Sequence, residues 1–278
     1  MYFPKDSFPP ASLEKLTLFI AHRFRQCLAA STVNTYISVR SYYHKLGNYQ
    51  DLTQNFIVRK TLNGYEKLRS AKDTRLPITS SILKMLLNSL NFTTKSYFIR
   101  MMLNSMYLLA FHAFLRVGEI TGCTPPKGNC LCANTIKFNL DNNNQPISIH
   151  LHMSQFKHSD RKHLPILVLQ RNLDNSEICP VMALWTYWQF RKHSNLEEPL
   201  FSFMDGSQVS RHFFSEQLQL SLKYSSLDKH NYKGHSFRIG AATTAAMLGI
   251  SEEKIQMMGR WHSNAFKKYI RIPTLNLS

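Results

Sequence analysis

An arginine and a glutamate three residues apart follow a long apolar segment of this sequence. Arg116 and Glu119 lie in the string FLRVGEI, directly after the apolar residues 97–114. A charge this close to a predicted core is costly unless it is paired, and residues three apart share one face of a helix. The segment therefore predicts either a structural ion pair or an arginine that serves a functional site.

Two further clusters of polar and aromatic residues lie near the C-terminus. In the string GHSFRIG, His235 and Arg238 are three residues apart, so they would project together from a helix. In the string GRWHSNAFKKY, Trp261 precedes Tyr269 by eight residues. Each cluster alone has an ordinary explanation, because His, Trp and Tyr commonly fill cores or their edges.

Taken together, these residue types suit phosphoryl transfer through a covalent intermediate. Two arginines can hold the phosphate oxygens on which negative charge builds in the transition state. A tyrosine hydroxyl, which ordinarily titrates at about pH 10, needs proton transfer or a strongly positive site to attack. The departing alkoxide needs an acid, such as a lysine. Since no carboxylate cluster suited to magnesium is found, we expect metal-free chemistry without a cofactor.

In this order, the motifs resemble the active-site pattern of the tyrosine recombinases of the phage-integrase type. That pattern is an arginine with a glutamate, a lysine between two strands, His-x-x-Arg, a tryptophan or histidine, and a tyrosine. The strings GHSFRIGAATTAAMLGI and GRWHSNAFKKYIR are most similar to recombinases of crypton and DIRS-type mobile elements. The resemblance covers nearly the whole chain.

The resemblance implies roles for the residues that match the pattern. Arg116 and Arg238 would clamp the non-bridging oxygens of the scissile phosphate. His235 would hydrogen-bond this phosphate or assist in taking the tyrosine proton, and Tyr269 would be the nucleophile. Glu119 would orient its neighbours without touching DNA.

Two assignments within the pattern have rivals. Lys157 would protonate the leaving 5′-oxygen, but Arg161 and Lys162 lie in the same predicted turn. Trp261 would fill the tryptophan or histidine position, with His262 as the alternative. The interval from Trp261 to the tyrosine is one residue shorter than in Cre-like members.

The resemblance thus predicts a site-specific DNA recombinase or integrase that works through a 3′-phosphotyrosyl intermediate. Its partners would be double-stranded DNA and, on that DNA, further copies of the chain in a tetrameric synapse. Without DNA we expect a monomer. The alternatives are a catalytically silent DNA-binding descendant, a type IB topoisomerase-like enzyme, and a metal-dependent nuclease or phosphatase, for which acidic ligands are lacking.

The front of the chain reads as three helices. Apolar residues recur on one helical face from Leu13 to Phe24 behind Ser12 as N-cap, and a second helix from Ser31 or Thr32 would end at Gly47. In that second helix we expect Val33, Tyr36 and Ile37 to face inward. A third helix covers 56–68, and the polar residues 71–77 read as a linker.

The remainder of the chain is mixed. Helices are predicted at 82–90, 97–114, 180–193, 210–222, 235–248, 252–258 and around Tyr269, and strands at 135–140, 147–153 and 164–169. We therefore predict a mostly α fold with a small antiparallel β-sheet. Residues 1–74 would form a helical, SAM-like core-binding domain that contacts DNA, and residues 75–278 a mixed catalytic domain.

The charge balance points to a polyanionic partner. The 278 residues include 34 Lys and Arg against 17 Asp and Glu, a net charge of +17, and such an excess fits nucleic acid. Residues 1–76 carry twelve basic and five acidic side chains, +7, so the excess is spread along the chain. The candidate DNA-contacting residues are Arg23, Arg25, Arg40, Arg59, Lys60 and Arg75. The alternative is a set of solvated helix faces.

Five cysteines without a hydrophobic N-terminal signal indicate a reducing compartment and free thiols. Cys123, Cys130 and Cys132 lie close together, but their spacing is not a usual zinc pattern. No apolar run is long enough to cross a bilayer, so we expect no membrane partner. The expected location is intracellular, and nuclear in a eukaryote.

Overall fold

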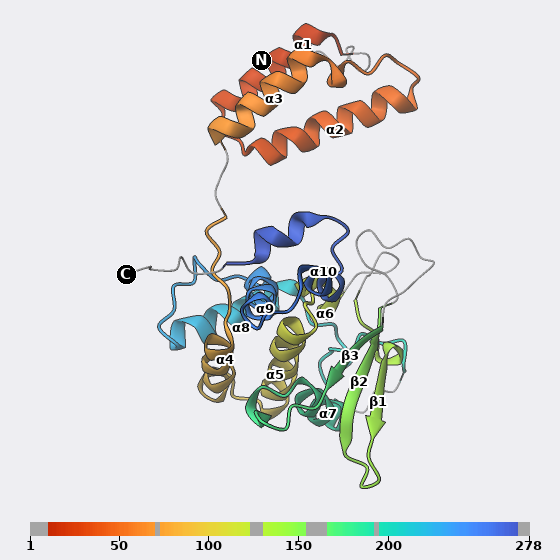
Figure 1. The fold of residues 1–278 in the computed structure, drawn as a ribbon, viewed down its shortest axis with the longest axis vertical. Coiled ribbons are helices and arrows are strands. Elements are labelled where there is room, and N and C mark those ends of the chain that lie inside the picture. Colours follow the sequence, from red (N-terminus) through yellow and green to blue (C-terminus); the bar gives the residue numbers. More distant parts are fainter. Residues whose placement is uncertain (1–10, 70–72, 123–129, 154–165, 192–194, 272–278) are drawn as a thin grey trace. The chain divides into compact units, whose positions relative to one another are not determined.

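A computed structural model describes residues 11–69, 73–122, 130–153, 166–191 and 195–271 of the chain. The chain divides into two compact units, Met1–Asp73 and Thr74–Ser278 (Figure 1). Each unit has its own hydrophobic core. The domain boundary expected from the sequence, between residues 74 and 75, lies one residue C-terminal to this division. Helices dominate both units and the second adds a three-stranded sheet, which confirms the predicted fold class. None of the helices in the described ranges is long and apolar enough to cross a membrane.

The first unit consists of three helices and a short 3-10 turn. These are α1 (Leu13–Arg25), α2 (Ala30–Leu46), η2 (Leu52–Gln54) and α3 (Phe56–Arg69). The Ser12 hydroxyl accepts a hydrogen bond from the Lys15 amide, as the predicted N-cap requires. Val33 and Ile37 are buried, but Tyr36 is 45% exposed. The prediction that Tyr36 faces inward is wrong, because the buried stripe of α2 runs through Val33, Ile37 and Ser41.

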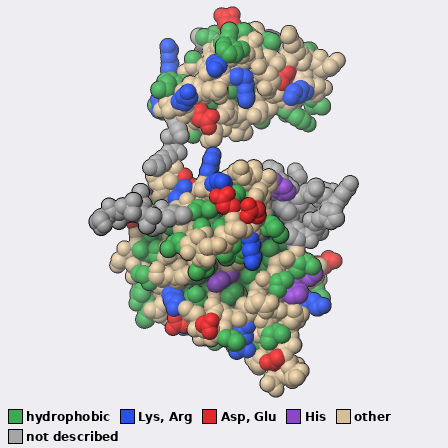
Figure 2. Space-filling model, in the orientation of Figure 1, with side chains coloured by type: hydrophobic (Ala, Val, Ile, Leu, Met, Phe, Trp, Pro, Cys, Tyr) green, Lys and Arg blue, Asp and Glu red, His purple; other side chains and the backbone are tan. Residues whose placement is uncertain are grey.

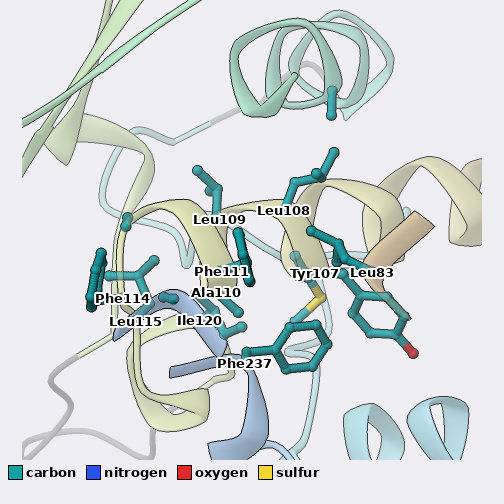
Figure 3. Close-up of a cluster of buried hydrophobic side chains, with 14 of the residues drawn as sticks. Leu83, Tyr107, Leu108, Leu109, Ala110, Phe111, Phe114, Leu115, Ile120 and Phe237 are labelled. Carbon is teal, nitrogen blue, oxygen red and sulfur yellow. The ribbon is translucent and has the colours of Figure 1, made fainter. Parts of the chain in front are cut away.

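The second unit is built around α5, which is buried along most of its length. Its helices are α4 (Ser80–Thr93), α5 (Tyr97–His112), α6 (Val117–Ile120), α7 (Pro180–Arg191), α8 (Arg211–Tyr224), α9 (His235–Met247) and α10 (Glu252–Gly259). Helices α4, α7 and α9 pack against α5. Figure 3 shows Tyr107, Leu108 and Phe111 of α5 in this core, with Phe237 of α9 nearby. The 3-10 segments are η3 (Ala133–Thr135), η4 (Ser176–Ile178) and η5 (Asn264–Tyr269).

The sheet lies beside α7. Its strands β1 (Ile136–Leu140), β2 (Pro146–His152) and β3 (Ile166–Gln170) are antiparallel, with β2 in the centre. The turn between β1 and β2 is held by the Asp141 carboxylate, which accepts hydrogen bonds from the amides of Asn143 and Gln145. The Phe138 ring lies edge-on to Trp185 and Trp188 of α7 (centroids 5.0 and 5.5 Å apart).

Part of the predicted linker is an ordered component of the second unit. The Leu76 amide donates to the Asn231 carbonyl (2.8 Å), and the Ile78 amide donates to the Ser236 carbonyl (3.0 Å). The Ile78 side chain is fully buried. The last residues of the predicted linker are therefore bonded to residues at and before the start of α9.

Candidate active site

His235 and Tyr269 meet although 34 residues separate them in the sequence. His235 is the first residue of α9, and its Nε2 lies 2.7 Å from the Tyr269 hydroxyl. Tyr269 ends η5, where the Thr243 hydroxyl donates to its carbonyl (3.2 Å) and accepts from the Arg271 amide (3.0 Å). The fold thus holds an imidazole against the phenol that the resemblance names as nucleophile.

Arg238 lies one helical turn after His235 and is completely buried. Its guanidinium donates to the carbonyl oxygens of Phe114 and Gly259. It stacks on the Trp261 ring at 4.2 Å and lies 5.7 Å from the Tyr269 ring centre. Burial, with smaller contributions from Arg116 and Arg260, holds the pKa of Arg238 well below the usual arginine value.

Arg116 caps a helix instead of extending one. Helix α5 ends at His112, Phe114 has a positive φ of 51°, and Arg116 is the N-cap of the short α6. The Glu119 carboxylate accepts from the Arg116 amide (2.8 Å) and from its Nη1 (3.0 Å). The expected pairing of the two side chains is observed, but Arg116 is the N-cap and Glu119 the third residue of α6, so the two do not share one face of a helix. The Arg116 side chain keeps 28% of its surface exposed.

Arg260 is a member of this cluster that the sequence patterns did not single out. It is the C-cap of α10 in the left-handed conformation, with φ 55°, which turns its side chain back into the core. Its Nη2 lies 2.8 Å from a Glu119 oxygen, and Nη1 donates to the Ala113 carbonyl at 3.2 Å. Burial lowers the pKa of Arg260, and Glu119 opposes this shift. The signal in the sequence was the interval to Tyr269. It is one residue shorter than in Cre-like members when counted from Trp261, and it equals theirs when counted from Arg260.

Trp261 covers the cluster. Its ring lies 5.0 Å from that of Tyr269 and 6.1 Å from that of Phe114. A Cβ on Gly259 would overlap the Trp261 ring, so glycine is needed for this close packing. His262, the alternative to Trp261, has an exposed side chain. Of the two candidates, the structure therefore brings only Trp261 against Tyr269.

The candidates for the general acid lie outside the described residues. They are Lys157 and its rivals, Arg161 and Lys162.

Five of the six basic residues predicted to contact DNA lie in the first unit, where they form two groups. Arg23 and Arg40 line a groove between α1 and α2, with a volume of about 270 Å³, whose other lining residues are Phe19, Tyr36, Val39 and Tyr43. Arg25, Arg59 and Lys60 are exposed. Figure 2 shows basic side chains spaced over the visible face of this unit. Arg75 is half-buried and belongs to the second unit.

The cysteine expectation is only partly correct. Cys27, Cys132 and Cys179 are free thiols, but Cys130 is disulfide-bonded. Within the described ranges, no group of three or more His, Cys, Asp or Glu side chains could hold a metal ion.

Comparison with known proteins identifies the fold. No protein-family model and no curated protein matches the sequence. The Tn1549 transposon integrase, solved with transposon right-end DNA, is 15% identical with a TM-score of 0.59, over 98% of this chain and 84% of that one. A lambda integrase dimer bound to a core site is 11% identical with a TM-score of 0.58, over 99% and 85%. The XerH site-specific recombinase bound to its difH substrate is 14% identical with a TM-score of 0.54, over 94% and 75%.

At these identities the likeness is one of fold. The long match to each structure spans both units of the chain. The chain therefore has the fold of the tyrosine site-specific recombinases and integrases.

Proposed function

We propose that this protein is a site-specific DNA recombinase or integrase that cleaves and rejoins strands through a 3′-phosphotyrosyl intermediate. The observation that carries the proposal is the 2.7 Å contact between His235 Nε2 and the Tyr269 hydroxyl, beside the buried guanidinium of Arg238. A tyrosine paired with a base and placed next to positive charge is the arrangement that attack on a phosphodiester requires.

The proposed reaction is a pair of transesterifications. The Tyr269 oxygen attacks phosphorus while His235 accepts its proton, and the bond from phosphorus to the 5′-oxygen breaks. The departing 5′-oxygen takes a proton, for which the resemblance to the family proposes Lys157. In the reverse direction, a 5′-hydroxyl from a partner strand attacks the phosphotyrosine and releases Tyr269. The phosphotyrosyl bond preserves the energy of the broken linkage, so no nucleotide cofactor is needed.

The scissile phosphate would be held by Arg116 and Arg238. The exposed part of Arg116 can meet DNA without rearrangement, whereas Arg238 has no exposed surface and stacks on Trp261. We propose that Trp261 moves aside when DNA binds, so that the phosphate replaces the indole against Arg238. This step would keep the arginine out of contact with other anions until a duplex is in place.

Double-stranded DNA is the proposed partner, and further copies of the chain would join it there as a tetrameric synapse. The solved structures of similar fold include a lambda integrase dimer bound to a core site and a Tn1549 integrase bound to transposon DNA. An origin in a crypton or DIRS-type element and a nuclear location belong to the same proposal.

The test is to trap the covalent adduct. The protein is incubated with a nicked duplex carrying the ends of the element that encodes it, then denatured and separated by electrophoresis. We expect wild type to form an adduct resistant to denaturant and Tyr269→Phe to form none. Since one hydroxyl adds little to a large electrostatic interface, both proteins should bind the duplex with nearly equal affinity. An adduct formed by Tyr269→Phe would overturn the assignment of the nucleophile.

One observation favours a second candidate, a DNA-binding protein that no longer cuts. The complete burial of Arg238 would suit a structural role for this arginine. Tight binding of the duplex, with no adduct and no relaxation of supercoiled DNA by wild type, would select this candidate. Relaxation without strand exchange would instead select a type IB topoisomerase.

A further inference from the structure

We infer that Arg260 is a positioning residue that fixes both proposed phosphate-binding arginines through acceptors it shares with them. The inference rests on the proposed function of the site. The Arg260 side chain is buried, with 1% of its surface exposed, and both of its Nη atoms donate to acceptors of the protein. Its effect would pass through the two acceptors, the Glu119 carboxylate and the Phe114 carbonyl.

The first shared acceptor is Glu119. One oxygen of its carboxylate pairs with Arg116 Nη1 (3.0 Å), and the other accepts from both the Arg116 amide and Arg260 Nη2 (each 2.8 Å). A carboxylate that accepts hydrogen bonds at both oxygens is restricted in its rotation. Arg260 and the Arg116 amide together thus fix the orientation of the Glu119 carboxylate toward the Arg116 guanidinium.

The second shared acceptor is the Phe114 carbonyl. Arg238 donates to it through Nη1, and Arg260 reaches it through Nη2 at 3.4 Å. Arg260 also donates to the preceding carbonyl, that of Ala113 (3.2 Å). It therefore fixes the backbone turn between α5 and α6 on which Arg238 rests.

The backbone at Arg260 supports a requirement for this particular side chain. A helix C-cap with positive φ is usually glycine or asparagine, since other residues are strained there. The chain nevertheless carries an arginine with φ 55°, and its guanidinium meets three acceptors. Lysine could not serve all three, because its ammonium lacks the planar fork of arginine.

The charge of Arg260 also acts on its neighbours. Three guanidiniums, those of Arg116, Arg238 and Arg260, surround the single carboxylate of Glu119, and the repulsion from Arg116 and Arg260 contributes to the lowered pKa of Arg238. Arg260 therefore adds positive potential to the site.

Arg191 provides a matched control. It is also a buried arginine, on α7, and it pairs with Glu198 (2.9 Å) and the Ser202 hydroxyl (2.8 Å). Replacing either arginine with methionine removes a buried charge pair and should lower stability. Only the loss of Arg260 should change the rate of adduct formation per folded molecule.

The experiment measures single-turnover adduct formation on the nicked duplex, corrected for the folded fraction, with duplex affinity measured in parallel. We expect Arg260→Met and Arg260→Lys to slow adduct formation by about tenfold to a hundredfold, as a small misplacement of catalytic groups does. Duplex affinity should stay unchanged. In an Arg116→Lys background, Arg260→Met should cost less than in wild type, because both changes disturb one unit. Arg191→Met should have no effect on the rate in either background.

Side-chain NMR of the free protein separates this inference from the proposed function. We expect Arg260→Lys, the milder variant, to shift the Nε–Hε signals of Arg116 and Arg238, and Arg191→Met to leave them in place. Unshifted signals in Arg260→Lys, or an adduct rate equal to that of wild type, would overturn the positioning role. If wild type forms no adduct but the signals shift, the proposed function fails and the positioning role stands.

Discussion

Arg116 and Arg238, which resemble a matched pair in the sequence, occupy different environments. Arg116 is partly exposed and pairs with a carboxylate, whereas Arg238 is fully buried and donates to two backbone carbonyls. A partly exposed ion pair contributes little to stability. A buried carbonyl left without a donor costs about 1–3 kcal/mol. The same substitution at the two positions should therefore have different consequences.

We predict that Arg116→Lys and Arg238→Lys each slow adduct formation by about 10²–10³-fold, since an ammonium cannot reproduce the two-pronged phosphate contact. Arg238→Lys should also lower the free energy of unfolding by about 1–3 kcal/mol, because one carbonyl loses its donor. Arg116→Lys should change it by less than about 1 kcal/mol. Rapid-quench kinetics and urea denaturation measure the two effects. A near-normal rate in either variant would argue strongly against the phosphate clamp.

At the scale of elements, α9 depends on close contact with the extended segment beside it. Gly240 lies two residues after Arg238, and a Cβ there would overlap the Ile78 carbonyl oxygen. This oxygen belongs to the backbone, whose Ile78 amide is itself bonded to the Ser236 carbonyl of α9. The segment and the helix therefore cannot separate to admit a methyl group without moving the residues that carry the site.

We predict that Gly240→Ala lowers the free energy of unfolding by about 1–3 kcal/mol through overpacking, although alanine is intrinsically better in a helix by about 1 kcal/mol. It should also slow adduct formation, because His235 and Arg238 lie on the displaced helix. Gly64→Ala in α3 is the control: nothing lies within 4 Å of its Cβ position, so it should stabilise the first unit by about 0.5–1 kcal/mol. Thermal denaturation measures the change in stability of both variants. A Gly240→Ala variant more stable than wild type would contradict the packing argument.

At the scale of the whole molecule, the net charge of +17 favours binding to a polyanion. Exposed basic residues such as Arg59 and Lys60 lie on the first unit, and further basic residues lie on the second. Each phosphate neutralised by a protein releases counterions, so affinity falls as salt rises. The charge distribution therefore sets how strongly the binding of a duplex depends on salt.

We predict a steep linear fall of log affinity with log salt concentration for the wild-type chain. The double variant Arg59→Gln/Lys60→Gln should reduce the slope by up to about 0.9 for each phosphate that the protein no longer neutralises. Lys84→Gln, which removes an exposed lysine of α4 that pairs with Glu177, should leave the slope unchanged. Fluorescence anisotropy with a labelled duplex measures the affinity at each salt concentration. A flat salt profile in wild type would remove the case for an electrostatic DNA interface.

The sequence by itself determined the features that depend on neighbours along the chain. Ser12 predicted a helix start because an N-cap acts on amides two or three residues away. The three-residue interval between His235 and Arg238 placed both on α9 for the same local reason. The order of the site motifs along the chain carried the resemblance to the tyrosine recombinases, and this resemblance implied their fold.

Only the tertiary structure decided how distant segments meet. His235 and Tyr269 lie 34 positions apart, with the rest of α9, helix α10 and most of η5 between them, and no local periodicity records that their side chains end 2.7 Å apart. Likewise, nothing in the string GRWHS assigned Arg260 a role, and only the structure shows that its left-handed cap turns the side chain into the core. Its partner Glu119 lies 141 residues away. A contact of this kind depends on the packing of whole helices, and the sequence near either residue does not specify it.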